Sequence, residues 1–200
     1  MNKLLIRIMV LVLGIGAIFF TTRDLYASIG NVIIQEGDSL IERKIGEDVA
    51  SEVDLDIFSY DTIRTAKSKT AIEFIDTTRV DVTEHSKLII DEFVYDPNKK
   101  TGKLSLKASL GTVRYASGQI AKNSPTSIKI TTPTATIGVR GTDFSMTVDE
   151  LGSSTIILLP SCDTNGNCYV GEISVESDAG QVILSQAFQA TVVDTVSSTP

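Results

Sequence analysis

The sequence has few of the residues on which most catalytic and metal sites depend. It has no tryptophan, two cysteines and a single histidine, His85. A serine–histidine–aspartate triad would need that histidine, yet no serine lies in a G-x-S-x-G motif. Zinc and iron sites need several histidine or cysteine ligands. We therefore expect no enzyme, no metal and no cofactor, with His85 in a solvated turn. A hydrolase that uses a pair of carboxylates stays an alternative.

Positive charge is also scarce. The chain has 18 Lys and Arg residues against 25 Asp and Glu residues, which gives a formal net charge of −7. Non-specific affinity for nucleic acids comes from Lys and Arg, and the sequence has no basic stripe with interleaved aromatic residues. We therefore expect no nucleic-acid partner.

The N-terminus has the pattern of a secretory leader. Lys3 and Arg7 precede an apolar run of about 13 residues, Ile8 to Phe20, which is typical of a signal peptide. A membrane span needs roughly 20 apolar residues. We predict a signal peptide over residues 1–27 and an exported protein, periplasmic or extracellular. An uncleaved anchor in the inner membrane is the alternative, and it is the only membrane contact that we expect.

The two cysteines, Cys162 and Cys168, flank five turn-forming residues, 163–167. In an exported protein, an even cysteine count around a turn predicts a disulfide. A redox pair is one alternative, although the spacing is not C-x-x-C. Calcium is the other, because Asp163, Asn165 and Asn167 alternate as at the start of a calcium loop. However, that loop would have Cys168 at its sixth position, where glycine is required.

Nearly every later segment alternates between apolar and polar residues with a period of two, which predicts β-strands. About a dozen short strands with little helix imply an all-β fold, an antiparallel sandwich or roll. Residues 43–56 are the least clear, and predict either a short helix or an irregular crossing. We predict one domain over residues 28–193 and a flexible tail over 194–200. The apolar stripes are Ile72/Phe74, Val80/Val82, Leu104/Leu106, Val113/Tyr115, Ile128/Ile130, Phe144/Met146/Val148, Ile173/Val175 and Val182/Leu184.

The segment from Thr131 to Phe144 differs from the rest. Pro133 lacks an N–H group and should end a strand. Gly138 and Gly141 bracket Val139-Arg140, and glycine permits either a positive φ or a close backbone approach. Arg140 is then presented from a tight corner. In a structural role, its guanidinium binds carbonyls or a carboxylate of a neighbouring strand. In a functional role, it recognises an anionic group.

This segment resembles the T-P-x-A-x-x-G-V-R-G-T-x-F signature of the FecR-domain family. Upstream, 60–65 resembles the family's G-D-x-I-x-T segment, with Tyr60 in place of the glycine. Residues 71–78 resemble its A-x-I-x-F-x-D-G-T strand, with Asp76 displaced by one position and the glycine missing. Residues 111–114 resemble its G-x-V-R segment. The signature residues that we take as candidates for an interaction site are Thr132, Pro133, Gly138, Arg140, Gly141, Thr142 and Phe144.

The resemblance implies an all-β periplasmic sensor or interaction domain. In the best-known members of the family, a cytoplasmic anti-sigma region precedes one membrane span, and the domain contacts an outer-membrane receptor. Here only about seven residues precede the apolar run, so we expect a free-standing domain without that region. We expect a non-catalytic module that engages an envelope protein or polymer through sheet edges and loops. A membrane-anchored component of envelope signal transduction is the alternative.

Overall fold

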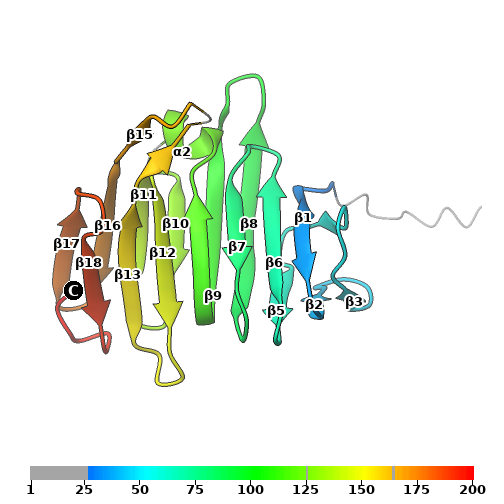
Figure 1. The fold of residues 1–200 in the computed structure, drawn as a ribbon, viewed down its shortest axis with the longest axis horizontal. Coiled ribbons are helices and arrows are strands. Elements are labelled where there is room, and N and C mark those ends of the chain that lie inside the picture. The colour runs from blue at the N-terminus through cyan, green and yellow to red at the C-terminus, as the bar shows by residue number, and fades with distance from the viewer. Residues whose placement is uncertain (1–26, 125, 164) are drawn as a thin grey trace, which may run out of the picture.

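Two β-sheets pack face to face, and the chain passes from one end of this sandwich to the other (Figure 1). The computed structural model describes residues 27–124, 126–163 and 165–200. The predicted leader therefore lies outside the described residues, apart from Ala27. The predicted all-β fold with little helix is confirmed. It has eighteen strands in the described part of the chain, more than expected, because several are only two residues long.

Sheet A is antiparallel throughout. Its strands are, in spatial order, β4 (Asp56–Ile57), β1 (Gly30–Glu36), β6 (Lys69–Phe74), β7 (Arg79–Val82), the end of β9 (Thr101–Ala116), β12 (Asp143–Val148), β13 (Ser154–Leu159) and β18 (Ala190–Val193).

Sheet B has one parallel pair, β9 with β10, and is otherwise antiparallel. Its strands are, in spatial order, β3 (Val49–Ala50), β2 (Ser39–Glu42), β5 (Thr62–Thr65), β8 (Lys87–Asp96), the start of β9, β10 (Ile128–Thr131), β11 (Thr136–Arg140), β16 (Glu172–Ser177) and β17 (Gly180–Leu184).

Strand β9 belongs to both sheets. Its first part pairs with β8 and β10, and its last part pairs with β7 and β12. The change of sheet occurs at Gly111, whose φ is 80° and where an added Cβ would lie 2.1 Å from the Ser86 hydroxyl oxygen. Both conditions require glycine. The kink also reverses which residues face inward, so that Leu106 and Val113 are both fully buried.

The core lies between the sheets and consists of the predicted apolar stripes. Members of these stripes on β6, β7, β9, β12 and β16 are buried, and only Val182 on β17 is partly exposed. Burial of one such side chain contributes about 1.5–3 kcal/mol. The alternation of apolar and polar residues along each strand therefore predicts which side chains lie on the inner faces of the two sheets.

The conformation of two segments could not be decided from the sequence. Residues 43–56 form the irregular crossing, with only the short strand β3 and the first residue of β4, and the helical alternative is wrong. The helix that does form, α2 (Gln119–Asn123), was not predicted, because five residues are too few to show helical periodicity. The Asp76 carboxylate accepts a hydrogen bond from the Ile120 N–H (3.1 Å), which holds this helix over the core.

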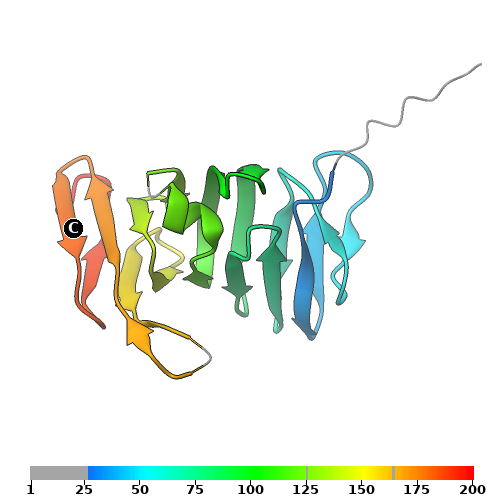
Figure 2. The same cartoon turned by 90° about the horizontal axis from the view of Figure 1, so that it is seen from above.

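A hairpin and the C-terminal tail complete the fold. Strands β14 (Ser161–Cys162) and β15 (Cys168–Tyr169) form a separate two-stranded hairpin that projects from the body of the sandwich (Figure 2). In the tail, the Val196 carbonyl accepts a hydrogen bond from the Asp178 N–H (2.9 Å). The domain bounds and the flexibility of the tail stay predictions.

Candidate functional site

The signature segment, residues 131–144, carries the chain from sheet B into sheet A. Strands β10 and β11 form a hairpin in sheet B, and β12 then begins in sheet A. Gly141 makes the turn between β11 and β12 with a φ of 59°, a conformation that favours glycine. We call residues 138–142 the signature corner.

The first part of the signature ties the two sheets together. Pairing between β10 and β11 ends just before Pro133. The Thr132 hydroxyl oxygen accepts hydrogen bonds from the Ala135 N–H (3.0 Å) and from the Ser154 hydroxyl (2.8 Å). The hydroxyl oxygens of Thr134 and Ser154 lie 2.7 Å apart. These three side chains are buried, so this turn has a structural role between sheet B and β13 of sheet A.

The last part of the signature anchors β12 in the core. The Thr142 hydroxyl donates to the Leu159 carbonyl (3.2 Å), and the Thr142 carbonyl accepts from the Ser117 hydroxyl (2.6 Å). The Phe144 ring lies 5.3 Å from the Tyr115 ring, centroid to centroid. Thr142, Phe144 and Tyr115 are fully buried, so buried contacts hold the C-terminal side of the corner in place.

Gly138 shows a close approach instead of a positive φ. A Cβ at this position would lie 2.7 Å from the Ser174 hydroxyl oxygen. Gly138 also lines a surface groove of about 420 Å³ over β11, β16 and β17. Its lining includes Arg140, Ser174, Gln181 and Ile183. This groove offers hydrogen-bonding groups beside one guanidinium, which suits a polar or anionic ligand group.

Arg140 has the carboxylate partner that the structural role predicts. Its Nη1 lies 2.9 Å from Oε1 of Glu172, the residue directly opposite on β16. The arginine side chain is 64% exposed, and such surface pairs contribute at most about 1 kcal/mol. The pair therefore orients the guanidinium without removing it from solvent, and the recognition role stays a prediction.

The β14–β15 hairpin leaves the sandwich beside this arginine. A Cβ on Gly171, at the base of the hairpin, would lie 2.3 Å from the Arg140 carbonyl oxygen. The predicted disulfide is present, since Cys162 and Cys168 are bonded across the hairpin with their Cα atoms 4.0 Å apart. The adjacent Tyr169 is 48% exposed and presents an aromatic ring to solvent.

The carboxylate of Asp163 organises the hairpin loop. It accepts hydrogen bonds from the N–H groups of Asn165 (2.9 Å) and Asn167 (2.9 Å) and from the Asn167 side-chain amide (3.1 Å). Hydrogen bonds from Asn167 and then Asn165 hold the pKa of Asp163 below its ordinary value. Within the described ranges, no group of three or more His, Cys, Asp or Glu residues is placed to hold a metal ion. The loop geometry is thus explained by internal hydrogen bonds.

The two positions where the sequence departs from the family's glycines have left-handed backbones. Tyr60 has a φ of 74° and Thr77 a φ of 67°. Each adjoins a buried aspartate. Burial raises the pKa of Asp61, and the Phe58 N–H and the Arg43 guanidinium oppose that shift. Asp76 is fully buried and accepts a hydrogen bond from the Thr78 hydroxyl (2.8 Å). Both turns therefore have the geometry for which glycine is preferred.

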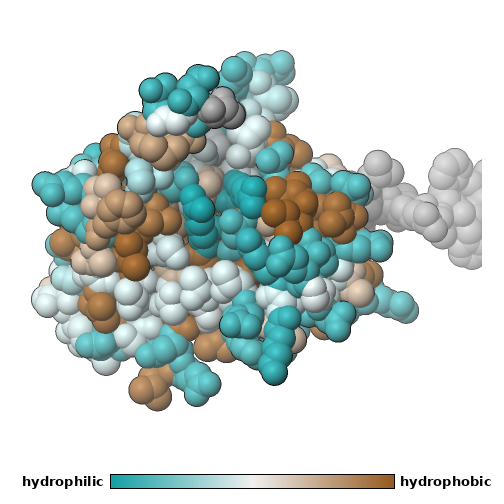
Figure 3. Space-filling view, viewed as in Figure 1, coloured by the Kyte–Doolittle hydropathy of each residue, from teal (hydrophilic) through white to brown (hydrophobic). Residues whose placement is uncertain are grey.

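The two outer faces differ in character. The face of sheet A is mostly hydrophilic along its middle, with hydrophobic areas toward both ends (Figure 3). The outer face of sheet B carries the signature groove and a second, larger groove over β2, β5, β8 and β9. No sequence pattern indicated this second groove, because its residues come from four strands that are distant in sequence.

These features define a two-layered β module in which the signature corner forms a crossover between the two sheets and the β14–β15 hairpin lies beside it. Residues 61–159 match the family model described as FecR protein, and the match includes the whole signature segment. These residues therefore belong to the FecR-domain family, as the sequence predicted. The family is associated with the cell envelope and with signal transduction.

The sandwich is larger than the matched segment. Strands β1 to β4 precede it and β14 to β18 follow it. Comparison with curated proteins finds no match, and neither does comparison with solved structures. Among the described residues, no helix has the length and apolar character needed to cross a membrane.

Proposed function

We propose that this chain is a non-catalytic interaction module of the cell envelope that binds a protein partner at the signature corner. The observation that carries the proposal is the exposed guanidinium of Arg140, which Glu172 orients beside the base of a projecting hairpin. Arginine and tyrosine are enriched among the residues that dominate binding energy at protein interfaces. Arg140 on β11 and Tyr169 on β15 place one residue of each type on neighbouring elements.

The non-catalytic part of the proposal is supported by the burial of two aspartates. The Asp61 and Asp76 carboxylates are buried and accept hydrogen bonds from backbone N–H groups. Neither is accessible to a substrate as a general acid or base. His85 lies exposed in the turn between β7 and β8, with no side-chain hydrogen bond in the described part of the protein. We propose no nucleic-acid partner, in keeping with the net charge of −7.

We further propose that the domain functions outside the cytoplasm. The Cys162–Cys168 disulfide supports this location, since disulfides persist mainly in oxidising compartments. Mass spectrometry of the native N-terminus tests the mode of export. A mature chain that begins at Ser28 supports the cleaved form, whereas an intact leader supports the anchored signalling component.

Capture of partners from the native envelope tests the binding surface. The full chain serves as bait in four forms: wild type, Arg140→Ala, Tyr169→Ala and the control Lys122→Ala, which removes an exposed charge from α2. We expect wild type and the control to retain the same protein, identified by mass spectrometry, and the other two variants to lose it. Thermal unfolding of each variant checks that the fold is retained. Undiminished capture by both Arg140→Ala and Tyr169→Ala would contradict the proposal.

A further inference from the structure

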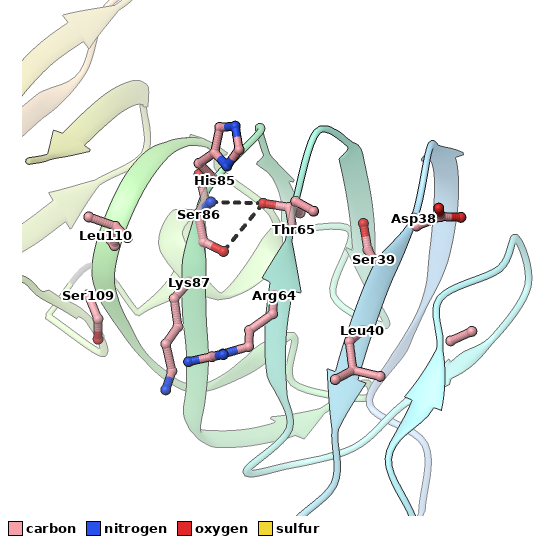
Figure 4. Close-up of a pocket in the computed structure, with 12 residues that line it drawn as sticks. Asp38, Ser39, Leu40, Arg64, Thr65, His85, Ser86, Lys87, Ser109 and Leu110 are labelled. Carbon is pink, nitrogen blue, oxygen red and sulfur yellow. Dashed lines mark hydrogen bonds between the residues drawn. The ribbon is translucent and has the colours of Figure 1, made fainter. Parts of the chain in front are cut away.

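The larger groove on the outer face of sheet B holds a second site, separate from the signature corner. It has a volume of about 680 Å³ and lies over β2, β5, β8 and β9 (Figure 4). Its lining includes the apolar residues Leu40, Ala50 and Leu110 and the cations Arg64 and Lys87. An apolar surface with two cations at its centre differs from the polar signature groove.

Four of these side chains form a single row across the sheet. Leu40 lies opposite Arg64, Arg64 opposite Lys87, and Lys87 opposite Leu110. Leu40 is 39% exposed and Leu110 is 36% exposed, so the apolar ends of the row are accessible. We call these residues the Leu–Arg–Lys–Leu row.

The centre of the row carries two cations, of which only Arg64 has a carboxylate partner among the described residues. Arg64 and Lys87 are direct cross-strand neighbours, and like charges in that arrangement destabilise a sheet. Their charged ends lie side by side in Figure 4. Nε of Arg64 lies 2.9 Å from Oε1 of Glu42, but Lys87 takes part in no ion pair among the described residues. An anion between the two cations would relieve the repulsion.

One wall of the groove is held by a hydrogen bond between two buried residues. The Thr65 hydroxyl oxygen accepts a hydrogen bond from the Ser86 N–H (2.9 Å), which joins β5 to the start of β8. Thr65 and Ser86 are buried, and both line the groove. A site that is already ordered loses less conformational entropy when a ligand binds.

The spacing of the row specifies the shape of the ligand. Neighbouring strands are about 4.8 Å apart, so three strand spacings place Leu40 and Leu110 about 14 Å apart. An extended peptide rises about 3.3 Å per residue and places residues i, i+2 and i+4 on one face, so its outer pair is about 13 Å apart. Two apolar side chains with one acidic side chain midway between them therefore match the row.

We propose that the Leu–Arg–Lys–Leu row binds an extended peptide segment of a protein, in which an acidic residue lies between apolar residues two positions away on either side. The acidic side chain lies between Arg64 and Lys87, and the apolar side chains cover Leu40 and Leu110. A polyanionic polymer fits less well, because the net charge of −7 repels a long anion and a polysaccharide has no side chains for the apolar ends.

Peptide titration tests the proposal directly. The full chain is titrated with fluorescently labelled Leu-Thr-Glu-Thr-Leu, blocked at both ends, and with the same peptide carrying Gln in place of Glu. We expect the Glu peptide to bind about tenfold more tightly, a difference typical of a charge-assisted contact. Equal affinity for the two peptides, or tighter binding of an oligogalacturonate than of the Glu peptide, would overturn the proposal.

Variants locate the binding to the row. Lys87→Gln and Leu110→Ala should each weaken binding of the Glu peptide severalfold. The matched controls are Lys107→Gln and Val94→Ala, which alter an exposed cation and an exposed apolar side chain elsewhere on β9 and β8. Both controls should bind as the wild type does. If the controls weaken binding as much as the row variants do, the row is not the site.

Lys87→Glu gives an independent readout. It replaces the like-charge pair with an opposite-charge pair, which stabilises a sheet. We expect a higher melting temperature together with loss of peptide binding. A lower melting temperature with retained binding would contradict the assigned role. The result is independent of the signature corner, whose Arg140 is unchanged in every one of these variants.

Discussion

Gly171 lies directly against the Arg140 carbonyl, so that a Cβ on the glycine would be 2.3 Å from that oxygen. The carbonyl belongs to the backbone and cannot rotate away. We expect Gly171→Ala to lower the free energy of unfolding by about 3 kcal/mol, in the range of overpacked sites. The control is Gly166→Ala in the hairpin loop, where an added Cβ meets nothing within 4 Å and only the positive φ costs free energy. Chemical denaturation of both variants measures the difference, and equal losses would contradict the close contact.

Thr77 occupies a left-handed turn with a φ of 67°. This conformation is unfavourable for a β-branched residue, and its cost is about 1–2 kcal/mol relative to glycine. We expect Thr77→Gly to raise the melting temperature by about 2–4 °C, the shift that 1 kcal/mol produces in a domain of this size. Thr77→Ala retains the Cβ and should give no such gain. Calorimetry of the two variants distinguishes strain at this turn from a simple effect of removing the threonine side chain.

Tyr115 carries a buried hydroxyl that has no hydrogen-bond partner among the described residues. Thr78 and Ser117 are polar neighbours of this hydroxyl, but neither reaches it with full hydrogen-bond geometry. Tyr115→Phe removes the unpaired group, and we expect a gain in the free energy of unfolding of about 1–3 kcal/mol. Tyr169→Phe, on the exposed hairpin, should leave stability unchanged.

The same residue predicts a dependence on alkaline pH. Burial raises the pKa of the Tyr115 phenol above its ordinary value, which is about 10 in an unfolded chain. The folded protein therefore keeps this proton when the unfolded chain has lost it. Its contribution to stability is complete below about pH 10 and decreases as the pH rises above that value. Denaturation at about pH 8.5 and 11 should show a smaller loss for Tyr115→Phe than for wild type, and identical losses would refute the assignment.

The disulfide between Cys162 and Cys168 closes a short loop in a hairpin outside the core. We expect the Cys162→Ser/Cys168→Ser variant to lose at most about 2 kcal/mol, the value for so short a loop, and to keep the sandwich intact. In the denatured wild-type chain, an alkylating reagent should add two labels only after a reductant. Labels added without reductant would show that the bond does not form in the native protein.

The fold class followed from alternation along single strands. Pairs such as Leu104 and Leu106 show which side of a strand is buried, and that information is local. The pairing of strands is not local. Gly111 joins two halves of β9 that belong to different sheets, and only the packing against Ser86 reveals why glycine is required there.

The candidate site was predicted in part. The corner at Gly138 and Gly141 was expected, as was a carbonyl or carboxylate partner for Arg140 in its structural role. The identity of Glu172 was not, since it lies beyond an intervening hairpin. The Leu–Arg–Lys–Leu row could not be predicted at all. Its members come from four strands, and each looks like an ordinary surface residue until cross-strand register places them side by side.

The order of the strands also determines how the domain responds to force. The first described residues and the C-terminus lie at opposite ends of the sandwich (Figure 1). Tension between these ends acts perpendicular to the strands. It therefore breaks the hydrogen bonds of one edge strand at a time instead of shearing all of them together. The molecule would then lengthen in small steps from both edges inward, and β9, which is hydrogen-bonded in both sheets, would be the last strand to separate.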